Sequence, residues 1–188
     1  MHRIAAFVSQ AGTTLEYLIK RSAEERTFQI VVVVSDVPCP ALDVARRYGI
    51  PALARKYVTK EQFTRDILFD LFDFKPLDLV VCAGFMRLLG ADIIKRYPKR
   101  ILNSHPALPG MFPGPHAIEE TLRAKMKTTG CTIMYVDEGV DDGEVIDWVT
   151  GIPVFPVDVP GTLRARIQEQ EKPLYYDAIC KVLREMET

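Results

Sequence analysis

Short runs of continuously apolar, β-branched residues alternate with segments of helical periodicity along most of this sequence. Residues 3–9 (RIAAFVS) and 28–36 (FQIVVVVSD) are two such runs, and a segment with apolar residues at helical spacing follows each of them. A strand that is apolar on both faces needs cover on both faces, and parallel strands need a crossover between them. The alternation therefore predicts an α/β fold: a Rossmann-like open, mostly parallel twisted sheet with helices on both faces.

Later parts of the sequence repeat this pattern. Residues 77–84, 100–106 and 131–137 are further predicted strands, and residues 60–74 and 117–125 are predicted helices. At 188 residues, with no internal repeat and no low-complexity linker, the chain is expected to form one domain. The predicted helix at 60–74 places one apolar stripe toward the core, formed by Phe63, Ile67, Leu71 and Phe74.

The charge balance narrows the class of partner. Lys and Arg total 24 against 25 for Asp and Glu, so the net charge is −1. Nucleic-acid-binding proteins usually carry a basic surplus, and no apolar run reaches the roughly 20 residues that span a membrane. The four cysteines are scattered without a CxxC pair, which is typical of structural thiols in a reducing compartment. We expect a cytoplasmic protein that binds neither nucleic acid nor membrane, as a monomer or homodimer.

Ligands of open α/β sheets bind beyond the carboxyl ends of the strands. Four segments lie at such predicted positions: 9–14 (SQAGTT), 83–89 (AGFMRLL), 103–114 (NSHPALPGMFPG) and 137–144 (DEGVDDGE). These segments are where we expect the functional side chains.

Asn103 and His105 lie two residues apart on a predicted strand, so their side chains point to the same side. An amide donor beside an imidazole suits stabilisation of a carbonyl oxygen that gains negative charge. The alternative is a pair of polar residues that satisfy a loop backbone. The prolines and glycines of residues 106–114 restrict the loop that follows and allow close approach of a ligand to its backbone.

The segments 9–14 and 137–144 each allow two interpretations. The first is a strand, a small turn with Gly12 and a helix start, which could bind a phosphate through exposed backbone N–H groups. Alternatively, it is an ordinary turn with a threonine cap. The second carries an Asp-Gly turn, but one of its carboxylates could orient His105 and raise its pKa.

The last helical segment carries a charge on its apolar stripe. Leu163, Ile167, Leu174, Ala178 and Val182 share that stripe with Glu171. A charge on an inward face is costly unless it meets a partner or ligand. Because Pro173 can break a helix, the alternative is that Glu171 lies exposed at a kink.

No metal site is predicted. His2, His105 and His116 lack ligand spacing, and neither an HExxH motif nor a Cys/His cluster occurs. A GxSxG nucleophile elbow is also absent, which argues against a Ser-His-Asp hydrolase.

Taken in order, three motifs resemble the folate-dependent formyltransferases. They are AGFMRLL (83–89), ILNSHPALPGMFPGPHA (101–117) and TGCTIMYVDEGVDDGEVI (129–146). The N-x-H-P…P-G…H pattern followed by D-x-G is specific for that superfamily, and the similarity covers nearly the whole chain. The resemblance implies transfer of the formyl group of 10-formyltetrahydrofolate, a co-substrate, without a metal. The acceptor that it implies is the amine of glycinamide ribonucleotide, in purine biosynthesis.

The resemblance also implies roles for individual residues. Asn103, His105 and Asp141 correspond to the catalytic trio, with Asp141 rather than Asp142 at the family position. The nucleotide half is implied at about 1–100, and the catalytic and folate-binding half at about 101–188. The resemblance implies that Gly12, Thr13 and Thr14 bind the phosphate of the substrate. It also implies that Pro106 binds the substrate and that Glu171 contacts its ribose. Folate-binding residues implied are Met86, Arg87, Leu89 and Val140.

The sequence departs from the family in two loops. The phosphate loop usually reads S-G-N-G-S-N in the family, whereas this chain has SQAGTT. The proline loop of this chain reads HPALPGMFPG, where a doubled Leu, a Pro and then a Lys or Ser are common in the family. Alternative activities are formyltetrahydrofolate deformylase, sugar N-formyltransferase and a non-catalytic nucleotide- or folate-binding module. Deformylases generally carry an extra N-terminal domain and methionyl-tRNA formyltransferases a C-terminal one. Because the sequence begins at the first predicted strand and ends soon after the last helix, we expect neither domain.

Overall fold

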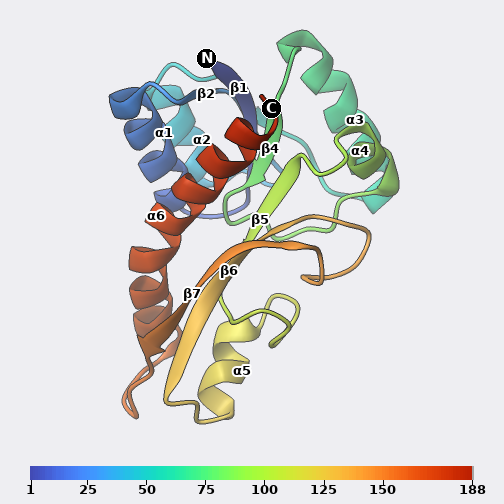
Figure 1. Ribbon diagram of the computed structural model, residues 1–188. Coiled ribbons are helices and arrows are strands. Elements are labelled where there is room, and N and C mark those ends of the chain that lie inside the picture. Colours follow the sequence, from blue (N-terminus) through green and yellow to red (C-terminus); the bar gives the residue numbers. More distant parts are fainter. Residues whose placement is uncertain (188) are drawn as a thin grey trace. The chain divides into compact units, whose positions relative to one another are not determined.

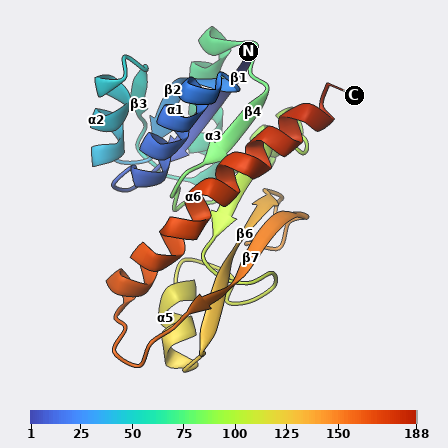
Figure 2. The same cartoon turned by 60° about the vertical axis from the view of Figure 1, so that its left-hand side comes forward.

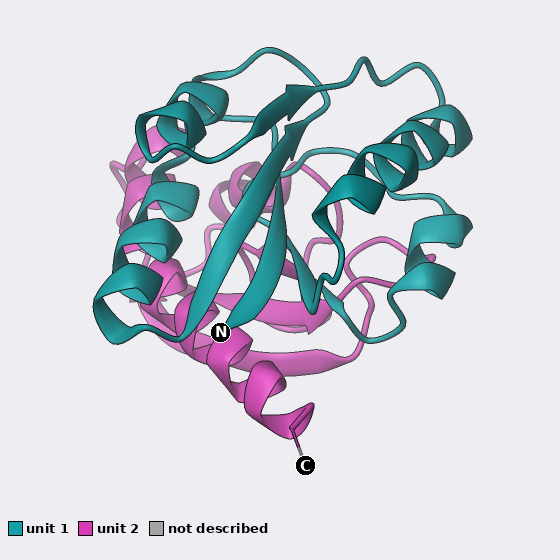
Figure 3. Cartoon of the chain, turned by 90° about the horizontal axis from the view of Figure 1, so that it is seen from above, with its two compact units in different colours: residues 1–102 teal, residues 103–188 magenta. Residues whose placement is uncertain are grey.

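The structure is a computed structural model that describes residues 1–187, and it contains two compact units. Unit 1 spans Met1–Leu102 and unit 2 begins at Asn103 (Figure 3). Strand β5 (Ile101–His105) begins in unit 1 and ends in unit 2.

Unit 1 is built from parallel strands with helices on both sides. The strand order is β3-β2-β1-β4, and every pair among them is parallel. Helices α1 and α2 lie on one side of these strands and α3 and α4 on the other (Figure 1). The elements are β1 (His2–Val8), α1 (Thr13–Glu25), β2 (Phe28–Ser35), α2 (Pro40–Arg47), β3 (Ala52–Ala54), α3 (Lys60–Asp70), η1 (Leu71–Phe74), β4 (Leu79–Cys82) and α4 (Ala91–Arg96).

The apolar runs predicted as strands form the core of unit 1, because their apolar side chains are buried on both faces of the sheet. Residues 4–8 of β1 and 30–35 of β2 are all buried, which is possible only where helices cover both faces. Helix α3 begins where the Thr59 hydroxyl accepts a hydrogen bond from the Gln62 N–H at 3.1 Å. Its predicted continuation to residue 74 is wrong in one respect, because the last turn is a 3₁₀-helix, η1.

Unit 2 combines a long antiparallel strand pair with two helices. Strands β6 (Thr128–Tyr135) and β7 (Val145–Pro153) pair along their length, and α6 (Pro160–Glu185) packs against both (Figure 2). Helix α5 (Ala117–Arg123) contacts α6. One core cluster joins all four elements: Ile118, Cys131, Ile152, Leu163 and Ile167.

The predicted fold class, α/β with mostly parallel strands and helices on both faces, is confirmed. The sequence pattern does not predict β7, because its residues are alternately exposed and it lacks a continuous apolar run. Nor does it predict β3, which is three residues long. Both are strands that pair with one neighbour within the described residues, and one-sided pairing leaves little apolar signature.

Candidate functional site

The carboxyl end of β5 delivers Asn103 and His105 to one side, as the strand period predicts. Both side chains reach the same carboxylate, that of Asp141. The Asn103 Nδ2 donates to Asp141 Oδ1 at 3.1 Å, and His105 Nδ1 lies 3.3 Å from Asp141 Oδ2. The His105 residue is only 3% exposed, so this contact is formed away from bulk water.

Asp141 is held in a conformation that few residues adopt. Its φ is +52°, in the left-handed region, where aspartate is among the tolerated non-glycine residues. Its carboxylate accepts a third contact, from the Gly114 N–H at 2.9 Å. Three donors on one carboxylate, supported by an unusual backbone, indicate that this side chain is fixed in place.

The second nitrogen of His105 is also bound. The His105 Nε2 lies 3.0 Å from the carbonyl oxygen of Met111. A carbonyl and a carboxylate can only accept hydrogen bonds, so the ring satisfies both neighbours only when both of its nitrogens carry a proton. The contacts therefore favour the imidazolium form of His105.

The electrostatics of this pair agree with the geometry. Burial by itself lowers the pKa of His105, but the hydrogen bond and charge of Asp141 and the carbonyls of Met111 and Phe112 outweigh it, and the pKa is raised. Burial by itself raises the pKa of Asp141, but His105, the Gly114 N–H and Asn103 outweigh it, and that pKa is lowered. Each partner thus stabilises the charged form of the other.

The proline loop between β5 and α5 is closely tied to the trio. The Ala107 N–H donates to the His105 carbonyl at 2.9 Å, and the Thr132 hydroxyl donates to the Ala107 carbonyl at 2.7 Å. Glycines take the left-handed conformation at Gly110 and Gly114. Stiffening of this loop was predicted, and its direct contact with His105 and Asp141 through Met111 and Gly114 was not. The clustered Pro-Gly pairs were the signal available.

The acidic loop after β6 supplies Asp141 to the trio, whereas the carboxylates of Asp137 and Asp142 make contacts within the loop itself. The Gly139 N–H donates to Asp137 Oδ1 at 2.9 Å, and the Tyr135 N–H donates to the Glu144 carbonyl at 2.9 Å. The Asp142 carboxylate packs against Gly139, and Val140 is exposed. Of the two adjacent aspartates, it is therefore Asp141 whose carboxylate meets Asn103 and His105.

Glu171 is buried on α6, at 8% exposure. The alternative of an exposed glutamate at a kink is wrong, because α6 continues through Pro173 as one helix of 26 residues. Burial, and then the negative charge of Glu171, raise the pKa of the Cys131 thiol to about 12. The charge of Glu171 therefore acts on the thiol of Cys131, a buried residue of β6.

In unit 1, the turn between β1 and α1 is built on Gly12. Its φ is +81°, a backbone conformation that favours glycine, and a Cβ at this position would lie 2.7 Å from the Cα of Ala41. Both the backbone conformation and the close contact therefore disfavour a side chain here. Gly12 is the N-cap of α1, and no side chain caps this helix. The alternative of a threonine cap is wrong. Thr14 is buried, whereas Thr13 is exposed.

The segment after β4 carries Met86, Arg87 and Leu89. Met86 and Arg87 are exposed, and Leu89 is 6% exposed. Arg87 pairs with Asp36, its Nε lying 2.8 Å from Asp36 Oδ2. The sequence reasoning missed Asp36, although its place directly after β2 puts it at a carboxyl strand end.

Residues 2–179 of the sequence match the formyl transferase family. The chain belongs to the formyl transferase family. That family assignment confirms the resemblance read from the motifs around Asn103 and Asp141.

Among relatives of this formyl transferase, phosphoribosylglycinamide formyltransferase of Bacillus subtilis is 32% identical over 188 residues. That alignment covers 97% of this chain and 95% of the relative. The trifunctional purine biosynthetic protein adenosine-3 of Drosophila melanogaster is 34% identical over 176 residues, 90% of this chain. This chain spans only 13% of that longer protein.

Solved structures give the same family. The crystal structure of phosphoribosylglycinamide formyltransferase from Bacillus halodurans superposes with a TM-score of 0.89 at 35% identity, over 96% of this chain and 95% of that one. Glycinamide ribonucleotide transformylase 1 from Symbiobacterium toebii gives a TM-score of 0.90 at 35% identity, over 95% and 86%.

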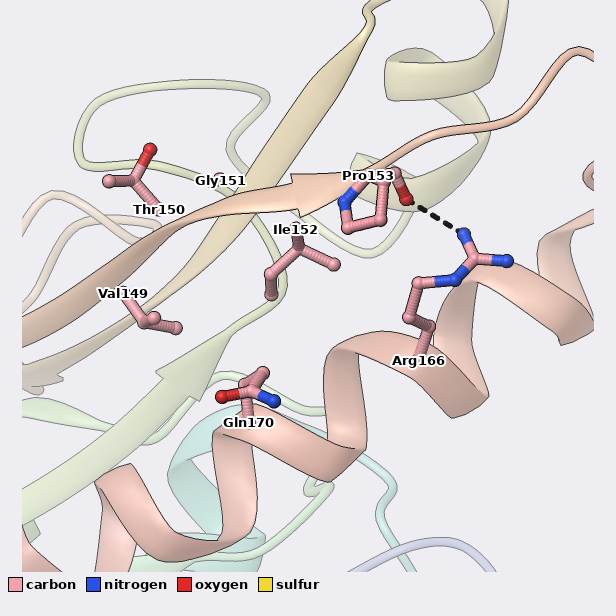
Figure 4. A pocket seen from close by; sticks show the side chains of 7 residues that line it. All are labelled: Val149, Thr150, Gly151, Ile152, Pro153, Arg166 and Gln170. Atoms are coloured by element: carbon pink, nitrogen blue, oxygen red, sulfur yellow. Dashed lines mark hydrogen bonds between the residues drawn. The ribbon is translucent and has the colours of Figure 1, made fainter.

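A pocket of about 230 Å³ in unit 2 of this formyl transferase holds none of the predicted site residues. It lies between β7 and α6 and includes Gly151, Arg166 and Gln170 (Figure 4). The Arg166 guanidinium donates to the Pro153 carbonyl and to both oxygens of Asp158, so its charge is already paired. The charged pair of His105 and Asp141 lies outside the lining of this pocket.

Within residues 1–187, no group of three or more His, Cys, Asp and Glu side chains is arranged to hold a metal ion. No helix in that part of the chain is both long enough and apolar enough to cross a bilayer.

Proposed function

We propose that this protein transfers the formyl group of 10-formyltetrahydrofolate to the amine of glycinamide ribonucleotide. The observation that carries the proposal is the convergence of Asn103 and His105 on Asp141, with His105 favoured as a cation. Relatives of nearly equal length that are named phosphoribosylglycinamide formyltransferase support the choice of acceptor.

The reaction follows from these groups. The amine nitrogen attacks the formyl carbon, and the carbonyl oxygen becomes an oxyanion in a tetrahedral intermediate. Asn103 and the imidazolium of His105 donate hydrogen bonds to that oxyanion. A proton then passes, through water held by Asp141, from the attacking nitrogen to N10 of the folate. The C–N10 bond breaks, and formyl-glycinamide ribonucleotide and tetrahydrofolate are the products.

The hydrogen bond to Met111 defines what must change when substrate binds. The His105 Nε2 proton that would stabilise the oxyanion points to the Met111 carbonyl in this structure. In the proposed mechanism the formyl oxygen replaces that carbonyl as the acceptor. Nδ1 stays with Asp141, which keeps the ring cationic throughout.

Binding roles are proposed unit by unit. In unit 1, Gly12, Thr13 and Thr14 bind the phosphate of the nucleotide, since the α1 N-terminus lacks a side-chain cap and a helix start favours an anion. Met86, Arg87 and Leu89 bind folate. In unit 2, the proposed binding residues are Pro106 and Glu171 for the nucleotide and Val140 for folate.

We further propose that the protein acts in the cytoplasm on these small molecules, as a monomer or homodimer. The near-zero net charge of −1 supports small substrates and not nucleic acid as its ligands.

One assay tests the proposal against its rivals. The protein is mixed with 10-formyltetrahydrofolate, with and without glycinamide ribonucleotide. Production of tetrahydrofolate that requires the ribonucleotide supports the transferase. Production without any amine indicates a deformylase, turnover only with an amino sugar nucleotide indicates a sugar N-formyltransferase, and binding without turnover indicates a non-catalytic module.

A further inference from the structure

The carboxyl ends of three strands of unit 1 meet at one buried carboxylate, that of Asp36. Asp36 follows β2, and its side chain is 1% exposed. The Ser9 hydroxyl, which follows β1, donates to Asp36 Oδ1 at 2.6 Å. The Arg87 Nε, which follows β4, donates to Asp36 Oδ2 at 2.8 Å. A carboxylate so deeply buried is costly to desolvate, and these two donors offset that cost.

The contact between Asp36 and Arg87 differs from that of another aspartate–arginine pair of unit 1, Asp70 and Arg55. Asp70 takes both Nε and Nη2 of Arg55, at 2.6 and 2.7 Å, so that fork is used up. Asp36 takes only Nε, because Ser9 occupies its other oxygen. Within residues 1–102, the terminal nitrogens of Arg87 donate no hydrogen bond, and the side chain is 48% exposed. A guanidinium fixed by Nε keeps its terminal fork available for another carboxylate.

A second contact restricts rotation of the same guanidinium. The Tyr57 ring lies beneath it, 5.1 Å from Cζ to the ring centroid. The Tyr57 hydroxyl in turn donates to the Leu88 carbonyl at 3.2 Å, within the same segment as Arg87. Arg87 is therefore held by a charge at Nε and by a face-on aromatic ring.

Ser9 extends the network from the arginine to the backbone beside it. Its hydroxyl donates to Asp36 and also accepts the Met86 N–H at 3.0 Å. The Ser9 N–H donates to the Gly84 carbonyl at 3.1 Å. One buried carboxylate thus controls both the Met86 backbone and the Arg87 side chain.

We infer that Asp36, acting with Ser9, is a positioning residue for folate: it presents the terminal fork of Arg87 to a carboxylate of the co-substrate. Folates carry such carboxylates on their glutamate portion, and a planar guanidinium fork matches a carboxylate in two-point geometry. This inference rests on the proposed function, because it assumes that the segment with Met86 and Arg87 binds the formyl donor.

The test compares Asp36→Asn with Asp70→Asn, a matched control that breaks the aspartate–arginine pair of Asp70 and Arg55 in the same unit. The side-chain oxygen of an asparagine at position 36 can still accept the hydrogen bond from Ser9. The atom that faces Arg87 Nε then becomes an uncharged N–H₂ group, which cannot accept the hydrogen bond from that nitrogen. For Asp36→Asn we expect the KM and Kd for 10-formyltetrahydrofolate to rise about tenfold, as for loss of a charged hydrogen bond. We expect kcat and the KM for glycinamide ribonucleotide to stay within about twofold of wild type. The control should change none of these.

A donor without the glutamate portion, 10-formyltetrahydropteroate, separates positioning from general damage. Wild type and Asp36→Asn should bind it equally, since neither can use the Arg87 fork on it. An equal loss for both donors, or an unchanged Kd for the full donor, would overturn the inference. If Asp36→Asn does not fold, Ser9→Ala replaces it, because it frees Oδ1 to capture the Arg87 fork and should weaken the full donor selectively.

The two proposals fail in different ways. Wild type that binds the donor but never formylates glycinamide ribonucleotide removes the proposed function, while the Kd ratios for the two donors still decide the role of Asp36. Normal turnover with no selective effect of Asp36→Asn and Ser9→Ala removes the inference alone. Wild type that binds no folate removes both.

Discussion

Asp141 Oδ2 lies 3.3 Å from His105 Nδ1, and the Gly114 N–H donates to that same oxygen at 2.9 Å. One oxygen thus fixes the imidazole of the β5 strand end and the end of the proline loop. Because the other oxygen holds Asn103, the two proposed oxyanion donors cannot be displaced independently of each other.

Asn103→Ala tests the oxyanion role most directly. Loss of one oxyanion donor typically costs on the order of 2.7–4 kcal/mol in transition-state stabilisation. We expect kcat to fall at least about a hundredfold with the KM values little changed, measured in steady state at saturating donor. Circular dichroism and the thermal midpoint show whether the fold is intact. Turnover near that of wild type would remove Asn103 from the mechanism.

Asp141→Asn tests the charge coupling in the pair. Without the carboxylate, burial dominates the environment of His105, and we expect the pKa of that imidazole to fall below its wild-type value. The high-pH limb of kcat should move to lower pH, and kcat itself should drop on the order of a hundredfold. Imidazole NMR titration follows the pKa of His105 directly. An unmoved His105 titration would contradict the coupling.

The same pair makes a pH-dependent contribution to stability. The raised pKa of His105 stabilises the fold fully below its unfolded value of about 6.5 and is lost as pH rises through the folded value. The lowered pKa of Asp141 stabilises it fully above about 3.9 and is lost as pH falls through the folded value. The difference in unfolding free energy between wild type and His105→Gln should therefore be largest between about pH 4 and 6.5. Urea unfolding across pH measures it, and a flat difference would disagree.

Gly12→Ala separates steric exclusion from backbone strain. Both Gly12 and Gly49 have positive φ, but a Cβ at Gly49 meets nothing within 4 Å. The free energy of unfolding of Gly49→Ala should fall by about 1 kcal/mol, because of the left-handed backbone alone. That of Gly12→Ala should fall by roughly a further 1–3 kcal/mol, because its Cβ is also overpacked against Ala41. Denaturant unfolding of both variants gives the comparison. Equal losses would show that the contact with α2 relaxes freely.

Glu171→Gln tests the proposed ribose contact. Glutamine keeps the size of the side chain and removes the buried charge, so we expect the KM for glycinamide ribonucleotide to rise about tenfold and the KM for the donor to stay unchanged. Glu169→Gln, an exposed glutamate of the same helix, is the control. A rise in both KM values would indicate a structural effect of the substitution and not a ribose contact.

The carboxyl ends of strands were predictable from the sequence because the relevant rules are local. An apolar run of β1 or β2 needs cover on both faces, and the strand period places Asn103 and His105 on one side. The buried face of α6 was predictable for the same reason, including Glu171. The helical stripe of α3 ended differently at η1, since capping and packing decide helix ends.

Contacts between distant residues were decided by the tertiary structure. Nothing in the spacing from Asn103 to Asp141 states which of two adjacent aspartates turns inward. In the folded chain Asp141 has the left-handed backbone, and its carboxylate contacts Asn103 and His105 and raises the pKa of that imidazole. The hydrogen bond between His105 Nε2 and the Met111 carbonyl arises likewise from chain segments brought together by folding. The same holds for the contacts of Asp36 with Ser9 and Arg87. Sequence period fixes the direction of a side chain from its own strand, whereas its partners depend on how the other strands and loops pack.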